Sequence, residues 1–246
     1  DLGCTGFYPW CSDYPETESL RRVSDEAVAL MHGAGLSLIE APAAYGGYQL
    51  SPRDLIEAER LVAHASPAAS WVLMVCQAHT FIAGRLPEQG QAEVFGPDPG
   101  VFIPGVPSRQ GTCQKADGGY LLNGRWPFAS GADHGDWLMV GSRGARNAAG
   151  EPSPGMIVVL PRADVEIDDT WFTLGMRGTG SKDIVLSDVF VPEHRAVPMA
   201  EAFVGTVPGV DVPLYRLPVA ATLATMLLGS LVGMSQRGLE LFVEDT

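Results

Sequence analysis

The segment NGRWPFASG, residues 123–131, is the stretch from which the fold of this chain can be worked out. It begins with an Asn-Gly pair, a strong hairpin-turn signal, and continues as an extended run with large side chains at alternate positions. Other short β-rich runs, bounded by Gly, Pro, Asn or Asp, lie on both sides of it. Residues 101–197 are therefore predicted to form an antiparallel β-barrel or sandwich. The predicted strands lie near Val101–Ile103, Gly119–Leu122, Trp137–Val140, Met156–Leu160 and Ile184–Phe190.

The residues that precede this β region are predicted to be helical. Ser24, with two acidic residues after it, is a favourable N-cap, and Ser51 and Asp54 have the spacing of a capping box. A further helix from Ala68 to about Arg85 is apolar nearly all round, so we expect it to be central in the fold. A short helix over Pro87–Phe95 completes this part.

From about Leu214 the pattern becomes helical again. Within it, Leu217–Met234 lacks a charged residue and has Gly229 and Gly233 at the GxxxG spacing of paired transmembrane helices. Its Pro, Thr, Ser and Gly residues favour instead a soluble bundle helix that is buried on most sides. Such a helix must dock on the N-terminal helices or on a partner helix outside the chain, because it has nothing else to cover it.

The composition excludes some classes of partner. The chain has 16 basic and 29 acidic residues and a net charge of −13, which repels nucleic-acid phosphates and anionic lipids. No nucleic-acid or membrane partner is predicted. The four cysteines, Cys4, Cys11, Cys76 and Cys113, form no CxxC pair, and no His cluster has metal spacing, so no metal site is predicted. The chain start lacks a signal-peptide pattern, so we expect a cytoplasmic protein.

Two groups of side chains are candidates for a functional site. Trp126, Phe128 and Ser130 should share one face of the extended segment, where two rings and a hydroxyl could contact a flat heteroaromatic cofactor. His79 lies two helical turns after Trp71 and could orient or deprotonate a phenol, because histidine titrates near neutrality. The alternatives are that the aromatic residues are ordinary β core and that His79 is a satisfied core histidine.

Two other patterns are weaker. Residues 175–182, GMRGTGSK, fail the Walker order of a phosphate-binding loop and precede a β run, so they predict a bend. A Ser-His-Asp hydrolase is not supported, since the chain has no GxSxG elbow.

Three separated motifs together resemble the acyl-CoA dehydrogenase superfamily. They are GYLLNGRWPFASG at residues 119–131, LGMRGTGS at residues 174–181 with DVFVP at residues 188–192, and PAAYGG at residues 42–47. The sequence Trp-Pro-Phe-Ala-Ser-Gly is similar to the branch of two-component flavin monooxygenases, and so is PGVPSRQ, residues 104–110, which on this resemblance is a flavin-binding loop. That branch includes the oxygenase component of p-hydroxyphenylacetate hydroxylase.

The resemblance implies an α+β multidomain fold. Residues 1–100 would form an N-terminal α-helical domain and residues 101–200 a middle β-barrel or sandwich. Residues 201–246 would be a linker and the first helix of a C-terminal helical bundle, which in the family mediates tetramer formation. On this resemblance the bundle is truncated here.

The resemblance also implies a reaction. A separate reductase would supply reduced FMN or FAD, and O2 would add to it to give a flavin C4a-hydroperoxide that hydroxylates an aromatic, phenolic substrate. Ser130 would lie near flavin N5. The cofactor-binding residues would be Gly105, Val106, Pro107, Ser108, Trp126, Phe128, Ala129 and Ser130.

The resemblance also implies that His79 and Trp71 bind the substrate and that His79 and Ser130 are the catalytic residues. Three alternatives stay open. The first is an acyl-CoA dehydrogenase, the second is an oxygenase that acts on nitrogen or sulfur, and the third is a truncated relative that serves as a binding or assembly module.

Overall fold

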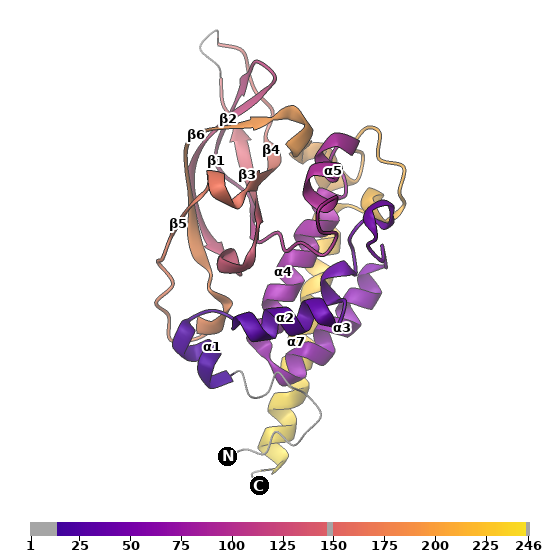
Figure 1. Cartoon of the computed structure of the whole chain (residues 1–246), viewed down its shortest axis with the longest axis vertical. Coiled ribbons are helices and arrows are strands. Elements are labelled where there is room, and N and C mark those ends of the chain that lie inside the picture. The colour runs from indigo at the N-terminus through magenta and orange to yellow at the C-terminus, as the bar shows by residue number, and fades with distance from the viewer. Residues whose placement is uncertain (1–13, 147–149, 245–246) are drawn as a thin grey trace.

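The computed structural model describes residues 14–146 and 150–244, and it shows helices packed beside one seven-stranded sheet (Figure 1). The predicted succession of helices, β region and helix is confirmed at this level. The division into three domains stays a prediction. Cys4 and Cys11 lie outside the described residues.

The helices begin and end near the residues that their caps predicted. Ser24 accepts a hydrogen bond from the backbone N–H of Ala27 at 3.1 Å, and Ser51 and Asp54 form the capping box. The helices are α1 (Tyr14–Leu20), α2 (Asp25–Gly33), α3 (Pro52–Ala65), α4 (Pro67–Ala83), α5 (Glu88–Phe95), α6 (Met199–Val204) and α7 (Val219–Glu244).

The strands follow the order β5-β6-β2-β1-β3-β4-β7 across the sheet. Most neighbours pair antiparallel, as between β2 and β6 or β3 and β4. The strands are β1 (Gly105–Ala116), β2 (Gly119–Ala129), β3 (Trp137–Gly144), β4 (Met156–Pro161), β5 (Glu166–Asp168), β6 (Lys182–Pro192) and β7 (Ala196–Pro198).

Two features of this sheet differ from the prediction of an antiparallel barrel or sandwich: one pair of strands is parallel, and the described strands close no barrel. β1 and β3 pair in parallel, because β2 returns the chain to the end where β1 begins and β3 starts from there. Among the strands that the structure describes, no ladder joins β5 to β7, so the sheet is open at its edges. Side chains from both of its faces are buried. Met139 and Val159 face the helical core, and Val140 and Val158 belong to a second core made of strand residues.

Two local predictions in this region were wrong. Val101–Ile103 is a buried connection and not a strand. Residues 104–110, which the resemblance treated as a loop, enter strand β1 at Gly105. Pro107 has no N–H for the ladder, and the pairing with β3 shifts register between Val106 and Arg109. The start of β1 is therefore irregular, which is why its sequence does not resemble an ordinary strand.

Helix α4 is the central element, as its apolar sequence predicted. Thirteen of its seventeen residues are buried. Val72, Leu73 and Cys76 pack with α2, whereas Phe81 and Ile82 belong to the core that α4 shares with the sheet and α7. In Figure 1, α4 accordingly runs between the sheet and the other helices. This helix can therefore place side chains against both halves of the molecule.

Helix α7 docks on α3 and α4, which was one of the two predicted possibilities. Its glycines allow the close approach. A Cβ atom on Gly229 would lie 2.4 Å from the carbonyl oxygen of Ile56, and one on Gly233 would lie 2.2 Å from that of Arg60. The GxxxG spacing thus serves packing within the chain. By length and composition alone, α7 could still cross a membrane, with 33% of its most apolar window buried.

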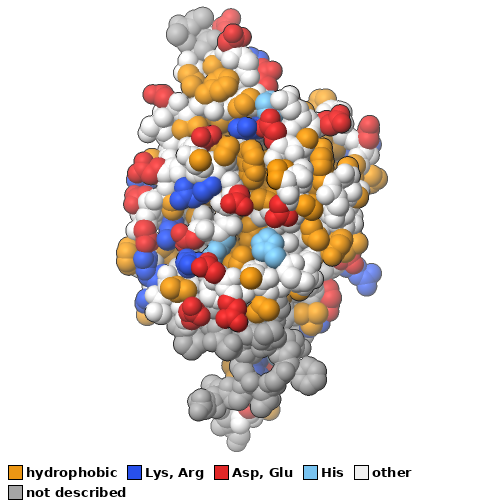
Figure 2. Space-filling model, viewed as in Figure 1, with side chains coloured by type: hydrophobic (Ala, Val, Ile, Leu, Met, Phe, Trp, Pro, Cys, Tyr) orange, Lys and Arg blue, Asp and Glu red, His pale blue; other side chains and the backbone are white. Residues whose placement is uncertain are grey.

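The opposite side of α7 exposes apolar side chains, and the rest of the visible surface is mixed. Leu228 and Leu231 are each 50% exposed, and Leu239 and Phe242 more so. Acidic side chains are spread over the face shown in Figure 2 and do not gather in one patch. On this face, the acidic side chains are therefore distributed and form no acidic patch.

Two carboxyl groups in the helical part of the protein, those of Glu59 and Glu40, are buried. Glu59 of α3 is fully buried, with its Oε2 atom 2.5 Å from where a Cβ on Gly229 would stand. Burial, with the nearby Glu40 carboxyl, raises the pKa of Glu59 to about 9 from its ordinary 4.5. Folded protein therefore keeps this proton between pH 4.5 and 9, where the unfolded chain releases it, and the free energy of unfolding falls as pH rises through that window.

We predict that Glu59→Gln stabilises the protein, by on the order of 2 kcal/mol at pH 8, because glutamine keeps the shape and has no charge to lose. The gain should grow from pH 4.5 to pH 9 in urea unfolding measurements. Glu57→Gln, on the exposed side of the same helix and paired with Arg60, is the matched control and should give no gain. A gain that does not depend on pH would contradict the assignment.

Candidate active site

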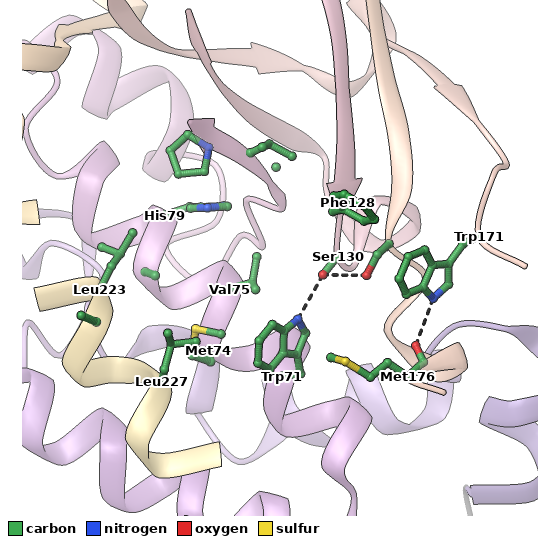
Figure 3. A pocket seen from close by; sticks show the side chains of 16 residues that line it. Trp71, Met74, Val75, His79, Phe128, Ser130, Trp171, Met176, Leu223 and Leu227 are labelled. Atoms are coloured by element: carbon green, nitrogen blue, oxygen red, sulfur yellow. Dashed lines mark hydrogen bonds between the residues drawn. The ribbon is translucent and has the colours of Figure 1, made fainter. Parts of the chain in front are cut away.

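A pocket of about 470 Å³ opens between α4, the sheet and α7 (Figure 3). Helix α4 supplies Trp71 and His79, and the start of β1 supplies Gly105, Val106 and Pro107. The end of β2 and the loop before β6 form another wall, and apolar residues of α7 complete the pocket. Helix α4 also contributes Met74, Val75 and Ala78, and the other lining residues are Phe128, Ser130, Trp171, Met176, Ser181, Leu223, Ala224 and Leu227.

The spacing of α4 explains how one helix reaches the pocket with several side chains. Trp71, Val75 and His79 are four residues apart, and Met74 and Ala78 lie between them on the adjoining row. Residues at this spacing share a helix face. Trp71 and His79 therefore both line the same cavity.

The predicted wall of Trp126, Phe128 and Ser130 was wrong in one member. Trp126 is fully buried in the strand core and donates its indole N–H to the carbonyl oxygen of Gly141 at 2.6 Å. Phe128 has φ +70° and is 67% exposed, since the ladder between β2 and β6 shifts register between Trp126 and Ala129. This bulge breaks the alternation that put the two rings on one face. Phe128 and Ser130 do line the pocket.

The other predicted cofactor contacts divide in the same way. Gly105, Val106 and Pro107 line the pocket. Ser108 lies beyond the lining, exposed, and accepts a hydrogen bond from the Gln110 side chain at 3.0 Å. Ala129 is fully buried among the strand residues and is not part of the lining either.

Sequence reasoning missed the wall that comes from residues 171–181. Trp171 meets Phe128 edge to face, with ring centroids 6.0 Å apart, and donates its indole N–H to the carbonyl oxygen of Met176 at 3.0 Å. Ser181 follows in the same segment. The positive φ of Met176, +55°, turns the chain here, and nothing in its residue type signals such a turn. The Trp171 ring was the one available sign of an aromatic wall.

His79 has a defined proton arrangement. Its Nδ1 atom lies 2.7 Å from the carbonyl oxygen of Ile103, and a carbonyl can only accept, so Nδ1 carries the hydrogen. Burial lowers the pKa of His79 to about 4, and the Ile103 carbonyl opposes this shift only in part. At neutral pH the ring is therefore uncharged, with Nε2 as a hydrogen-bond acceptor.

Ser130 occupies the polar side of the pocket. Its Oγ atom accepts a hydrogen bond from the indole N–H of Trp71 at 3.1 Å and lies 2.7 Å from the Oγ atom of Ser181 (Figure 3). The Trp71 bond joins helix α4 to the end of β2. The pocket thus combines three aromatic rings with a few placed polar atoms, which is typical of a site for a planar organic ligand. Over the described residues, no group of three or more His, Cys, Asp or Glu side chains could hold a metal ion.

Comparison with known proteins identifies relatives of the chain by sequence and by structure. No family model matches the chain. It is 34% identical over 232 residues to the "Flavin-dependent monooxygenase, oxygenase subunit HsaA" of Rhodococcus jostii, covering 93% of this chain and 60% of that protein. It is 33% identical to the "FADH(2)-dependent resorcinol hydroxylase, oxygenase component" of Rhizobium sp., covering 93% and 57%.

A solved structure agrees with these sequences. XiaF from Streptomyces sp., in complex with FADH2 and glycerol, superposes with a TM-score of 0.87 at 33% identity, covering 96% of this chain and 60% of that one. The chain therefore shares the fold of XiaF over nearly its whole length. It is a homologue of the oxygenase subunits of two-component flavin-dependent monooxygenases. It spans about three fifths of the length of these relatives.

The proton arrangement of His79 can be measured directly. We predict that its ring is the neutral Nδ1–H form at pH 7 and titrates near pH 4, because burial disfavours the charged ring. Nitrogen-15 NMR of the imidazole, assigned by loss of the signal in His79→Gln, reports both properties. A ring that titrates near pH 6.5, or one protonated at Nε2, would contradict the geometry.

Proposed function

We propose that this chain supplies the flavin and substrate pocket of a monooxygenase that hydroxylates a phenolic compound. The observation that carries the proposal is the pocket itself, in which Ser130 and the neutral His79 supply polar atoms to a largely aromatic and aliphatic lining. The named activities of the relatives in R. jostii and Rhizobium sp. support the reaction class.

The residues of the pocket fit a flavin ring. Phe128 stands out from the sheet with an exposed face, and the Gly105–Pro107 stretch presents backbone without bulky side chains. We propose that these residues and Ser130 hold reduced FMN or FAD. XiaF was solved with FADH2, which supports FAD. When bound, the reduced flavin supplies the electrons that activate O2.

His79 would then act on the substrate. Its Nε2 lone pair can accept a hydrogen bond from a phenol O–H, which draws electron density toward the ring and makes its carbon atoms better nucleophiles. The bond from Nδ1 to Ile103 fixes the orientation of the imidazole. Trp71, on the same helix face, offers an aromatic surface against which the phenol ring can lie. Apolar residues of α7, Leu223 and Leu227, would exclude water from the reacting groups.

The proposal includes partners and a location. A separate flavin reductase would deliver the reduced cofactor, and O2 and the aromatic compound would be the other reactants. The exposed leucines of α7, such as Leu228 and Leu231, support assembly into a homo-oligomer, which we propose to be a tetramer. We propose a cytoplasmic location, with α7 as a packed helix rather than a membrane span.

We predict that His79→Gln lowers the rate of phenol hydroxylation about a hundredfold, since glutamine lacks the acceptor nitrogen in the same place. The measurement supplies FAD or FMN, a flavin reductase, NADH, O2 and a panel of phenols, and quantifies hydroxylated product against NADH consumed. The variant should consume NADH with little product. His32→Gln is the matched control, because His32 packs on Phe102 outside the pocket and should leave the rate unchanged.

Further assays on the same protein distinguish the three alternative functions. Bleaching of bound flavin by an acyl-CoA, without O2 uptake, would favour an acyl-CoA dehydrogenase. Oxidation of an amine or thioether in preference to phenols would favour a nitrogen or sulfur oxygenase. A chain with no affinity for either flavin at micromolar concentration would be a binding or assembly module.

A further inference from the structure

The side chains that line the pocket offer it no free hydrogen-bond donor. Five of them carry an N–H or O–H group, and each hydrogen is directed at another atom of the protein. The indole of Trp171 and the imidazole of His79 donate to backbone carbonyls. The other three, Trp71, Ser130 and Ser181, belong to one chain of hydrogen bonds.

The direction of each hydrogen bond in this series follows by elimination, starting from Thr179. The Thr179 hydroxyl is 2.9 Å from the carbonyl oxygen of Met176, which can only accept, so Thr179 donates its single hydrogen there. In its 2.6 Å contact with Ser181, Thr179 must then accept. Ser181 has thereby used its hydrogen, so in the 2.7 Å contact with Ser130 the donor is Ser130. Ser130 in turn accepts from Trp71.

Bulk water has little access to this arrangement. Thr179, Ser181 and Ser130 are 2%, 4% and 6% exposed. The carbonyl oxygen of Thr179 also accepts the backbone N–H of Gly131 at 2.8 Å, which ties the two segments together. Hydroxyl groups held this way have little solvent to exchange partners with, so the fold favours one direction of the hydrogens.

We infer that Thr179 and Ser181 are positioning residues that hold Ser130 as a hydrogen-bond acceptor, so that this end of the pocket selects a ligand that brings an N–H or O–H group. The inference rests on the proposed function where the ligand is a flavin. Reduced flavin carries a hydrogen on N5, whereas oxidised flavin has only a lone pair there. A Ser130 oxygen with no hydrogen to give therefore favours the reduced form.

The test reverses the direction of these hydrogen bonds by removing the Thr179 hydroxyl, at which the series ends. In Thr179→Val, Ser181 has lost its acceptor and turns its hydrogen to Ser130, which frees the Ser130 hydrogen for the pocket. The ratio of the dissociation constants of oxidised and reduced FAD, measured without oxygen on the full chain, should fall about fivefold, the typical contribution of one neutral hydrogen bond. Ser181→Ala removes the acceptor of Ser130 directly and should lower the ratio similarly.

Two controls limit the interpretation. Thr179→Ser keeps the hydroxyl and should keep the ratio. Thr112→Val makes the same substitution on β1, where the hydroxyl donates to the carbonyl of Asn123 away from the pocket, and should also keep it. The Trp71 indole N–H resonance gives a readout that needs no flavin, and it should shift in Thr179→Val and Ser181→Ala but not in the controls.

The possible failures are distinguishable. Suppose that the unaltered chain binds FAD, and that Thr179→Val and Ser181→Ala leave the ratio and the indole resonance unchanged. The positioning role is then overturned while the proposed function stands. If the unaltered chain binds neither FAD nor FMN in either redox state, the proposed function is overturned, and with it the preference for reduced flavin.

Discussion

The structure depends on the need to cover an apolar helix on every side. Helix α4 packs against α2 and α3 on one flank, α7 on another and the β sheet on a third. Beyond its first turn, the helix is incompletely covered at Trp71 and Val75, and these residues line the pocket together with the buried His79. The cavity is thus bounded by elements that burial of α4 requires in any case, which gives its polar atoms fixed positions.

Fixed positions matter because the chemistry is carried by few polar groups. The His79 ring is oriented by a single backbone carbonyl, and the Ser130 hydroxyl by an indole and a second serine. Each of these bonds joins segments that are far apart in sequence, α4 with the entry to β1 and α4 with the end of β2. Packing and hydrogen bonding therefore specify the same arrangement, and a change in either would disturb the other.

Much of the fold could be predicted from local signals, and the limits have physical causes. Helix caps such as Ser24 and Ser51 act through neighbouring backbone groups, so the sequence contains all that they need. Phe128 could be placed at the site from its motif, but not its orientation, because the bulge beside it is a property of pairing with β6. Trp126 was misplaced for the same reason. Ser181 and Trp171 meet Ser130 and Phe128 only through the turn at Met176, which residue type does not indicate.

The carbonyl oxygen of Met176 accepts three hydrogen bonds, from the Trp171 indole, the Thr179 hydroxyl and the Thr179 backbone N–H. One atom thus fastens both ends of the segment that carries the Trp171 ring. Displacing that ring breaks its bond to an oxygen atom that two bonds from Thr179 hold in place, so the aromatic wall should resist thermal motion. A molecule that enters the cavity would then meet less resistance on the α7 side, where aliphatic side chains can change rotamer one at a time.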